Sequence, residues 1–173
     1  MNPILAFYDG GPDYKGRRLH DILAYGNRAL EWHHDYIQVL FPLPEASPYN
    51  LRAPLLDANT IERFDADEYR PVGLVAAFRR MLRFYGFRQS RTTDEVVRKN
   101  FDRCRRNWLT PHNHNFRRIS RILRCLTLLG LKPYAEKFLA ALVKVYMQYS
   151  NTMGWERMYK CEDAISGVGA NYR

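Results

Sequence analysis

Helical periodicity runs through nearly the whole chain, and it leaves few folds open. Apolar residues recur every three or four positions from Phe116 to Leu129 and again from Phe138 to Tyr149. Such spacing places them on one face of an amphipathic helix. We find no internal repeat, and no alternation typical of a β-strand extends over more than a few residues. The pattern therefore predicts an all-α fold of roughly seven helices.

Glycine and proline positions set the expected ends of these helices. Gly86 and Gly130 each follow an apolar run and are natural C-terminal stops. One helix is expected to run continuously over residues 27–40, and a basic helix is expected over 93–108. The stretch 42–56 carries four prolines and has no periodicity. It predicts an ordered, proline-rich loop after the second helix.

The length and composition favour one soluble domain in a reducing compartment. A chain of 173 residues can bury a real core, and no apolar run reaches the ~18 residues of a membrane helix. The first residues show no basic segment of the kind that opens a signal peptide. The three cysteines form no close pair in the sequence. We expect a single domain over 1–165 with a flexible tail over 166–173, in the cytoplasm, or in the nucleus if the source is a eukaryote.

Positive charge is concentrated in the middle of the chain. The net charge is +9, and residues 79–132 hold 15 Lys and Arg against three Asp and Glu. Charge at this density attracts phosphates, nucleic acids and acidic partners, although a solvated basic surface explains the same pattern. The usual nucleic-acid-binding motifs are absent from the sequence. Weak, sequence-independent binding of nucleic acid by the 79–132 surface is therefore an alternative function.

Motifs for cofactor and metal chemistry are missing from the sequence. There is no GxGxxG, P-loop, GxSxG or HExxH. Glu31 and His34 have the spacing of half a di-iron carboxylate site, but the second half is missing. His112 and His114 would need a third histidine, and His33 and His34, adjacent on a helix, cannot both face them. We expect no cofactor, no metal and no catalytic residues, with an enzyme built on His34, His114 and arginines as an alternative.

Two polar stripes on otherwise apolar helices form the candidate binding site. Glu31, His34 and Gln38 follow an i, i+3, i+7 spacing on the helix expected over 27–40. His114, Arg118 and Arg121 follow an i, i+4, i+7 spacing on the helix expected after residue 114. Buried polar groups without partners cost about 1–3 kcal/mol each, so the stripes are expected to pair, for example Glu31 with Arg118 or Arg121. They form either a packing network or a site for a small anion at a helix N-terminus. The candidate residues are Glu31, His34, Gln38, His114, Asn115, Arg118 and Arg121.

The same segments resemble a known family. Residues 31–42, EWHHDYIQVLFP, are similar to the signature E-x-x-H-x-Y-I-Q-W-L-F-P of the opioid growth factor receptor conserved domain. Residues 81–86, MLRFYG, resemble its M-L-x-F-Y-G element, and residues 114–123, HNFRRISRIL, resemble its H-N-x-x-R-I-[TS]-R-I-L element. The similarity covers about residues 5–145 and departs from the signature at Val39. The chain is thus identified as a compact, single-domain member, similar to bacterial or fungal ones.

The resemblance implies a helical domain and favours binding of a partner over catalysis. The animal member that gives the family its name is implied to bind an opioid pentapeptide and to act at the nucleus. No catalytic residues come with the family. Taken with the polar stripes, the resemblance leads us to expect binding of a small anionic ligand, a peptide or a protein partner, with no membrane interaction and at most weak nonspecific binding of nucleic acid.

Overall fold

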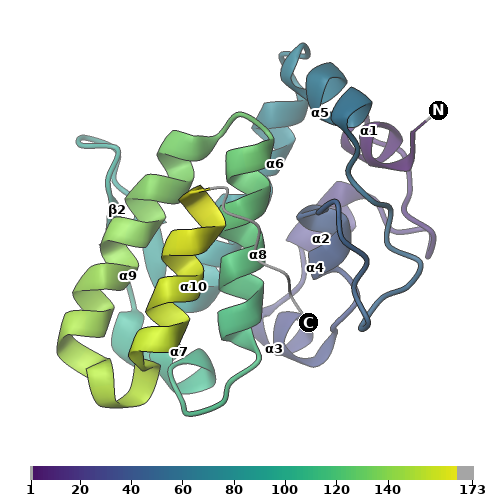
Figure 1. Cartoon of the computed structure of the whole chain (residues 1–173). Helices are drawn as coiled ribbons and strands as arrows, with labels where there is room; N and C mark the ends of the chain where they lie inside the picture. Colours follow the sequence, from purple (N-terminus) through teal and green to yellow (C-terminus); the bar gives the residue numbers. More distant parts are fainter. Residues whose placement is uncertain (1, 167–173) are drawn as a thin grey trace. The chain divides into compact units, whose positions relative to one another are not determined.

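The computed structural model describes residues 2–166 and is mainly helical (Figure 1). Within that range the chain forms ten helices and one two-stranded hairpin. The all-α class is confirmed, with more and shorter helices than the roughly seven expected. None of the helices in this range is both long and apolar enough to cross a membrane. The tail predicted over 166–173 lies outside the described residues except for Ser166, which ends a helix.

Contacts between residues divide the chain into two compact units, Met1–Arg80 and Met81–Arg173. The boundary falls within one long helix, α6 (Arg70–Tyr85). The single domain predicted over 1–165 stays a prediction, and we describe each unit separately.

The first unit contains five short helices before α6. Tyr8 joins three of them: its ring meets the Phe64 ring edge-on at 5.0 Å between centroids, and its hydroxyl donates to the Leu40 carbonyl at 2.5 Å. All three of these residues are buried. The first unit therefore has an apolar core of its own. The bounds of the helices are α1 Pro3–Tyr8, α2 Leu19–Leu23, α3 Asn27–Trp32, α4 Ile37–Leu40 and α5 Ala58–Asp65.

The continuous helix predicted over 27–40 is wrong, because α3 ends at Trp32 and α4 begins only at Ile37. His33 has an extended backbone, with φ −83° and ψ 134°. The Asn50 side-chain amide donates to the Asp35 carbonyl at 2.9 Å. In a continuous helix that carbonyl would accept from the N–H four residues later. A contact from the following loop thus replaces a hydrogen bond of the expected helix.

The proline-rich stretch 42–56 is a loop, as predicted, although it follows α4 rather than the second helix. Its backbone forms a bridge between Ser47 and Asn50, both of which are buried. The Leu56 N–H donates to the Leu43 carbonyl at 3.1 Å and closes the loop. The loop therefore has fixed internal contacts despite its lack of periodicity.

Three long helices of the second unit pack against one another and lie side by side in Figure 1. The apolar face predicted from Phe116 to Leu129 is buried, and Phe138, Leu142 and Val145 are the buried members of the next predicted face. Both predicted helices are confirmed. The last helix adds the buried side chains of Met158, Cys161 and Ile165. The bounds in this unit are β1 Phe87–Gln89, β2 Val96–Arg98, α7 Phe101–Trp108, α8 Asn115–Leu128, α9 Lys132–Met153 and α10 Trp155–Ser166.

The helix predicted over 93–108 is wrong before Phe101. That part of the chain contains β2, which forms an antiparallel hairpin with β1. β1 pairs with β2 in a register that places Phe87 opposite Arg98. Asn100 has a left-handed backbone (φ 59°) between β2 and α7. Gly86 is the stop that was predicted: its φ is +88°, and an added Cβ would lie 2.7 Å from the Phe101 Cα, so a larger residue does not fit.

Candidate functional site

The three candidate residues of the first unit do not share one helix face. Glu31 lies half-buried on α3, His34 is exposed in the break between α3 and α4, and Gln38 is buried on α4. The Gln38 Nε2 donates to the Ser47 hydroxyl at 3.3 Å, and its buried Oε1 accepts no hydrogen bond from the part of the chain that the structure describes. Gln38 therefore ties α4 to the proline-rich loop.

An ion-pair cluster that the sequence did not reveal holds the break between α3 and α4. The Asp35 carboxylate forms ion pairs with the Lys15 ammonium at 2.6 Å and with the Arg17 guanidinium at 3.2 Å. Arg17 also contacts Asp13 at 2.6 Å. Burial acts to raise the pKa of Asp35, but the hydrogen bond from Lys15 and the charge of Arg17 outweigh it and hold that pKa below its ordinary value. The spacing of these residues carries no sequence signal, because they meet only after folding.

The candidate residues of the second unit gather at the start of α8. Asn113 lies just before the helix, and its Oδ1 accepts from the Asn115 N–H at 2.9 Å and from the Asn115 Nδ2 at 3.0 Å. The Arg118 Nη1 donates to the Asn115 Oδ1 at 3.2 Å. Asn115 and Arg118 are buried, Arg121 is half-buried and His114 is exposed. Two of the four are thus closed to solvent and serve the packing.

Of the seven candidates, the structure joins Asn115 and Arg118 by a hydrogen bond, and it places Glu31, His34 and Gln38 on two helices and the break between them. The expected pairing of Glu31 with Arg118 or Arg121 joins residues of different units, and it stays a prediction. From the sequence, the seven residues form either a packing network or a binding site. In the structure Gln38, Asn115 and Arg118 are buried, whereas His34 and His114 are exposed to a partner.

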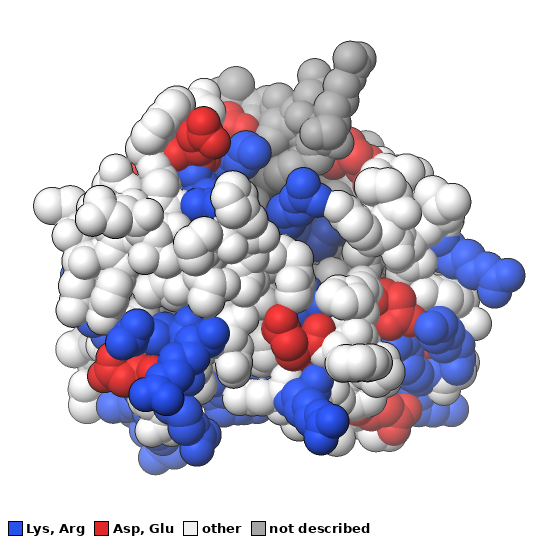
Figure 2. Space-filling model, turned by 90° about the horizontal axis from the view of Figure 1, so that it is seen from below, with Lys and Arg blue, Asp and Glu red and all other residues white. Residues whose placement is uncertain are grey.

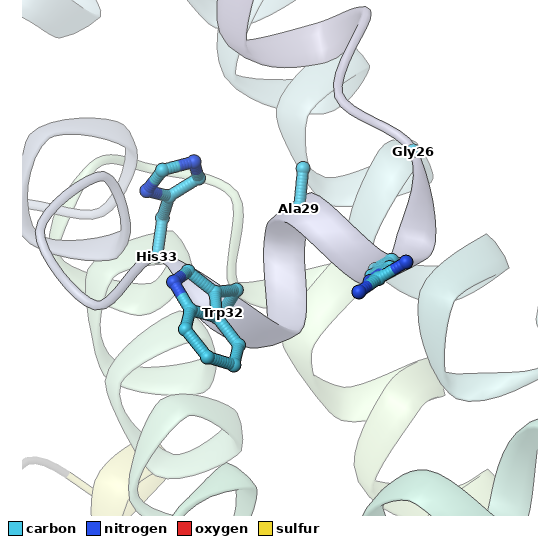
Figure 3. Close-up of a pocket in the computed structure, with 5 residues that line it drawn as sticks. Gly26, Ala29, Trp32 and His33 are labelled. Atoms are coloured by element: carbon cyan, nitrogen blue, oxygen red, sulfur yellow. The ribbon is translucent and has the colours of Figure 1, made fainter.

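A shallow hollow of about 510 Å³ lies along α3, lined by Gly26, Arg28, Ala29, Trp32 and His33. Figure 3 shows the Trp32 and His33 side chains at the C-terminal end of the helix. The Trp32 side chain is 78% exposed, and the His33 ring lies 5.4 Å from the Tyr25 ring. None of the seven candidates is among these lining residues. The exposed tryptophan next to the motif histidines was the signal that could have found the hollow.

Thiol and metal chemistry have little support in the structure. Among residues 2–166, no group of three or more His, Cys, Asp and Glu side chains is placed to hold a metal ion. The three cysteines are buried. Burial raises the pKa of the Cys161 thiol to about 12 and raises that of Cys125 as well. Thiols in that state are poor nucleophiles at neutral pH.

The basic charge of the chain belongs to the second unit. Residues 81–173 hold 18 Lys and Arg and seven Asp and Glu, a net charge of +11, whereas residues 1–80 hold nine and 11, a net charge of −2. Figure 2 shows Lys and Arg side chains gathered in clusters on one face of the molecule. Seven acids cannot neutralise 18 bases within this unit.

Five exposed bases of this unit come from adjoining elements, and we call them the junction surface. The Lys99 N–H donates to the Gly86 carbonyl at 2.7 Å, which joins the base of the hairpin to the end of α6. The Cys104 thiol lies 3.9 Å from the Arg83 carbonyl, which joins α7 to α6. The surface consists of Arg83, Arg88, Lys99, Arg103 and Arg106.

Comparisons with known proteins find relatives for most of the chain. A family model described as the opioid growth factor receptor (OGFr) conserved region matches residues 17–162. The opioid growth factor receptor of Rattus norvegicus is 39% identical over 120 residues, which is 69% of this chain and 20% of the receptor. The Homo sapiens receptor is 40% identical over 121 residues, 69% of this chain and 17% of the receptor.

A further relative is the opioid growth factor receptor-like protein 1 of Xenopus tropicalis. It is 36% identical over 121 residues, which is 70% of this chain and 23% of that protein. The chain therefore spans about a fifth of the length of the curated relatives it matches. The search of solved structures finds no match.

Proposed function

Because the chain belongs to the family of the opioid growth factor receptor conserved region, we propose that it is a helical binding domain that holds an anionic partner on its second unit. Several relatives are named receptors of an opioid growth factor. A receptor binds its partner and need not transform it. The name supports binding as the role of this segment, although the matched segment is only about a fifth of those receptors.

The observation that carries the proposal is the unequal charge of the two units, +11 against −2. A surface with such an excess of one sign raises the local concentration of oppositely charged partners and speeds their association. The five bases of the junction surface are all exposed to solvent. Arginine, which supplies four of them, matches the geometry of carboxylates and phosphates.

The geometry of the candidate residues supports binding more than catalysis. Buried Gln38, Asn115 and Arg118 hydrogen-bond to neighbouring side chains of the chain itself. General acid or base catalysis needs a titratable group within reach of a bound substrate. The hollow on α3 offers one such group among its lining residues, His33. Exposed His114 and half-buried Arg121 are the second-unit candidates that an anionic partner can reach.

Calorimetric titration of the full chain tests this proposal. The probes are inorganic polyphosphate and poly-L-glutamate, which share negative charge but differ in chemistry, with polyglutamine as the uncharged control. We expect at least one polyanion to bind at low ionic strength and to bind less tightly at physiological salt, because salt screens exposed charges. The absence of binding to both polyanions at low ionic strength would overturn the proposal.

A further inference from the structure

We propose that the junction surface binds the phosphate backbone of double-stranded nucleic acid without reading its sequence, an inference that rests on the proposed function and names the partner. Four features of the junction surface favour this partner: its fixed backbone, the availability of its charges, the absence of apolar anchors within its own segment, and the lack of exposed aromatic rings there.

The junction surface is built on buried contacts that fix its three elements. The Trp108 indole N–H donates to the Tyr85 carbonyl at 3.0 Å, which ties the end of α7 to the end of α6. The Phe87 ring packs at 5.3 Å from the Phe101 ring and joins β1 to α7. These aromatic side chains are buried. These contacts fix the backbone that carries the array of five bases, so binding needs to order their side chains but not the elements beneath them.

The charges of this array are available to a partner. None of the five side chains forms a hydrogen bond or an ion pair with the residues that the structure describes. The acid within α7, Asp102, is bound to Arg105 at 3.2 Å. At the hairpin tip, Asp94 contacts the Lys137 ammonium at 2.5 Å. These two acids therefore do not neutralise the positive charge of the array.

The segment 83–108, which supplies the array, contributes no large exposed apolar side chain, and this favours nucleic acid over the other anionic partners. The large exposed apolar side chains of the described residues lie outside residues 83–108. Protein interfaces depend on buried aromatic and aliphatic anchors, and stable anchoring to a membrane needs an apolar face or a lipid chain beside a basic patch. Interfaces with nucleic acid are more polar and far more positive than interfaces between proteins. The junction surface fits the last class.

The same array favours a duplex over a single strand. Proteins that bind single strands stack the bases on exposed aromatic rings, whereas Phe87, Phe101 and Trp108 here are buried. Duplex DNA presents one charge per about 1.7 Å of its axis. Contacts to phosphates position a protein but carry no sequence information. Binding through this surface is therefore independent of sequence.

Fluorescence anisotropy of the full chain with a labelled 20-base-pair DNA duplex tests the inference. We expect binding that is equal for duplexes of unrelated sequence and weaker for a single strand of the same length. The logarithm of the binding constant should fall with the logarithm of the salt concentration with a slope of about −0.9 per phosphate contacted, or about −4.5 for five contacts. Poly-L-glutamate serves as a competitor that tests the alternative of an acidic protein.

A matched pair of triple variants locates the site. The variant R88Q/R103Q/R106Q removes three charges from the junction surface, and R28Q/R52Q/R63Q removes three exposed charges from the first unit. We expect the first variant to lose more than tenfold in affinity and to flatten the slope by about 2.7, while the second changes affinity by less than threefold. Circular dichroism and the thermal midpoint confirm that both variants fold.

Each other outcome overturns a specific claim. Equal losses in the two variants would place duplex binding away from the junction surface. Binding of polyglutamate without binding of duplex would overturn this inference and leave the proposed function standing. Preference for one duplex sequence would contradict readout of the backbone alone. The failure of polyphosphate, polyglutamate and duplex to bind would end both proposals.

Discussion

Arg118 places a guanidinium in a buried position, where Asn115 accepts one of its hydrogen bonds. A buried charge is costly unless its donors are satisfied, because it has lost the hydration it would have in the unfolded chain. Asn115 in turn bonds to Asn113, which lies just before α8. One asparagine thus connects the segment before a helix to a buried arginine three residues further along.

Replacement of Asn115 by alanine should lower the free energy of unfolding by about 1–3 kcal/mol, because it leaves a buried donor of Arg118 without this acceptor. Urea denaturation followed by circular dichroism measures the change. The control is Asn151→Ala, an exposed position on α9, where we expect less than about 0.5 kcal/mol. Equal effects of the two changes would show that Asn115 has no special role in the packing.

Asn115 and Arg118 are both among the candidate residues named from the sequence, and the structure joins them by a hydrogen bond at 3.2 Å. The sequence could not separate them from His114, which is exposed. The direction in which a side chain points depends on how α8 packs on α9 and α10, and that packing involves residues far along the chain. The sequence therefore identifies polar positions on an apolar helix more readily than it separates a binding site from a packing network.

Secondary-structure elements with strong periodicity were predictable, and those fixed by contacts with other segments were not. The faces beginning at Phe116 and Phe138 repeat over several turns and are confirmed as α8 and α9. The segment containing Val96 and Val97 is short, and its β-branched residues form a strand because the residues after Gly86 pair with it. The residue pattern of the segment around Val96 alone therefore does not predict that it pairs with β1.

Gly86 is the residue on which the arrangement of α6, the hairpin and α7 depends. Alanine there would have an unfavourable positive φ, and its Cβ would lie 2.7 Å from the Phe101 Cα and 2.9 Å from the Cys104 Cβ. We expect Gly86→Ala to lower the free energy of unfolding by more than about 2 kcal/mol, from backbone strain and overpacking together. Thermal and urea denaturation measure the loss.

Gly26→Ala is the matched change for Gly86→Ala. Gly26 precedes α3 with a φ of −68°, and nothing lies within 4 Å of an added Cβ. The cost there should stay below about 1 kcal/mol, the loss expected when an N-cap becomes alanine. A Gly86 variant as stable as the Gly26 variant would contradict the close approach of α7 to the end of α6.

For the whole molecule, the distribution of charge is the property that the sequence predicts best. The segment 79–132 was basic in the sequence, and nearly all of it falls in the second unit. The net charge of a unit is counted from its residues alone and does not depend on the direction of any side chain. The exact ends of the helices, in contrast, depend on contacts between segments. The proposed function rests on this distribution rather than on any single contact.

Arginine footprinting of the full chain with phenylglyoxal, read by peptide mass spectrometry with and without inorganic polyphosphate, shows directly where an anion sits. The proposed function predicts slower modification of Arg88, Arg103 and Arg106 when polyphosphate is present. Arg28 and Arg52, exposed arginines of the first unit, should react at unchanged rates. Protection confined to the first unit, or no protection at polyphosphate concentrations that saturate the chain, would contradict an anionic partner held on the second unit.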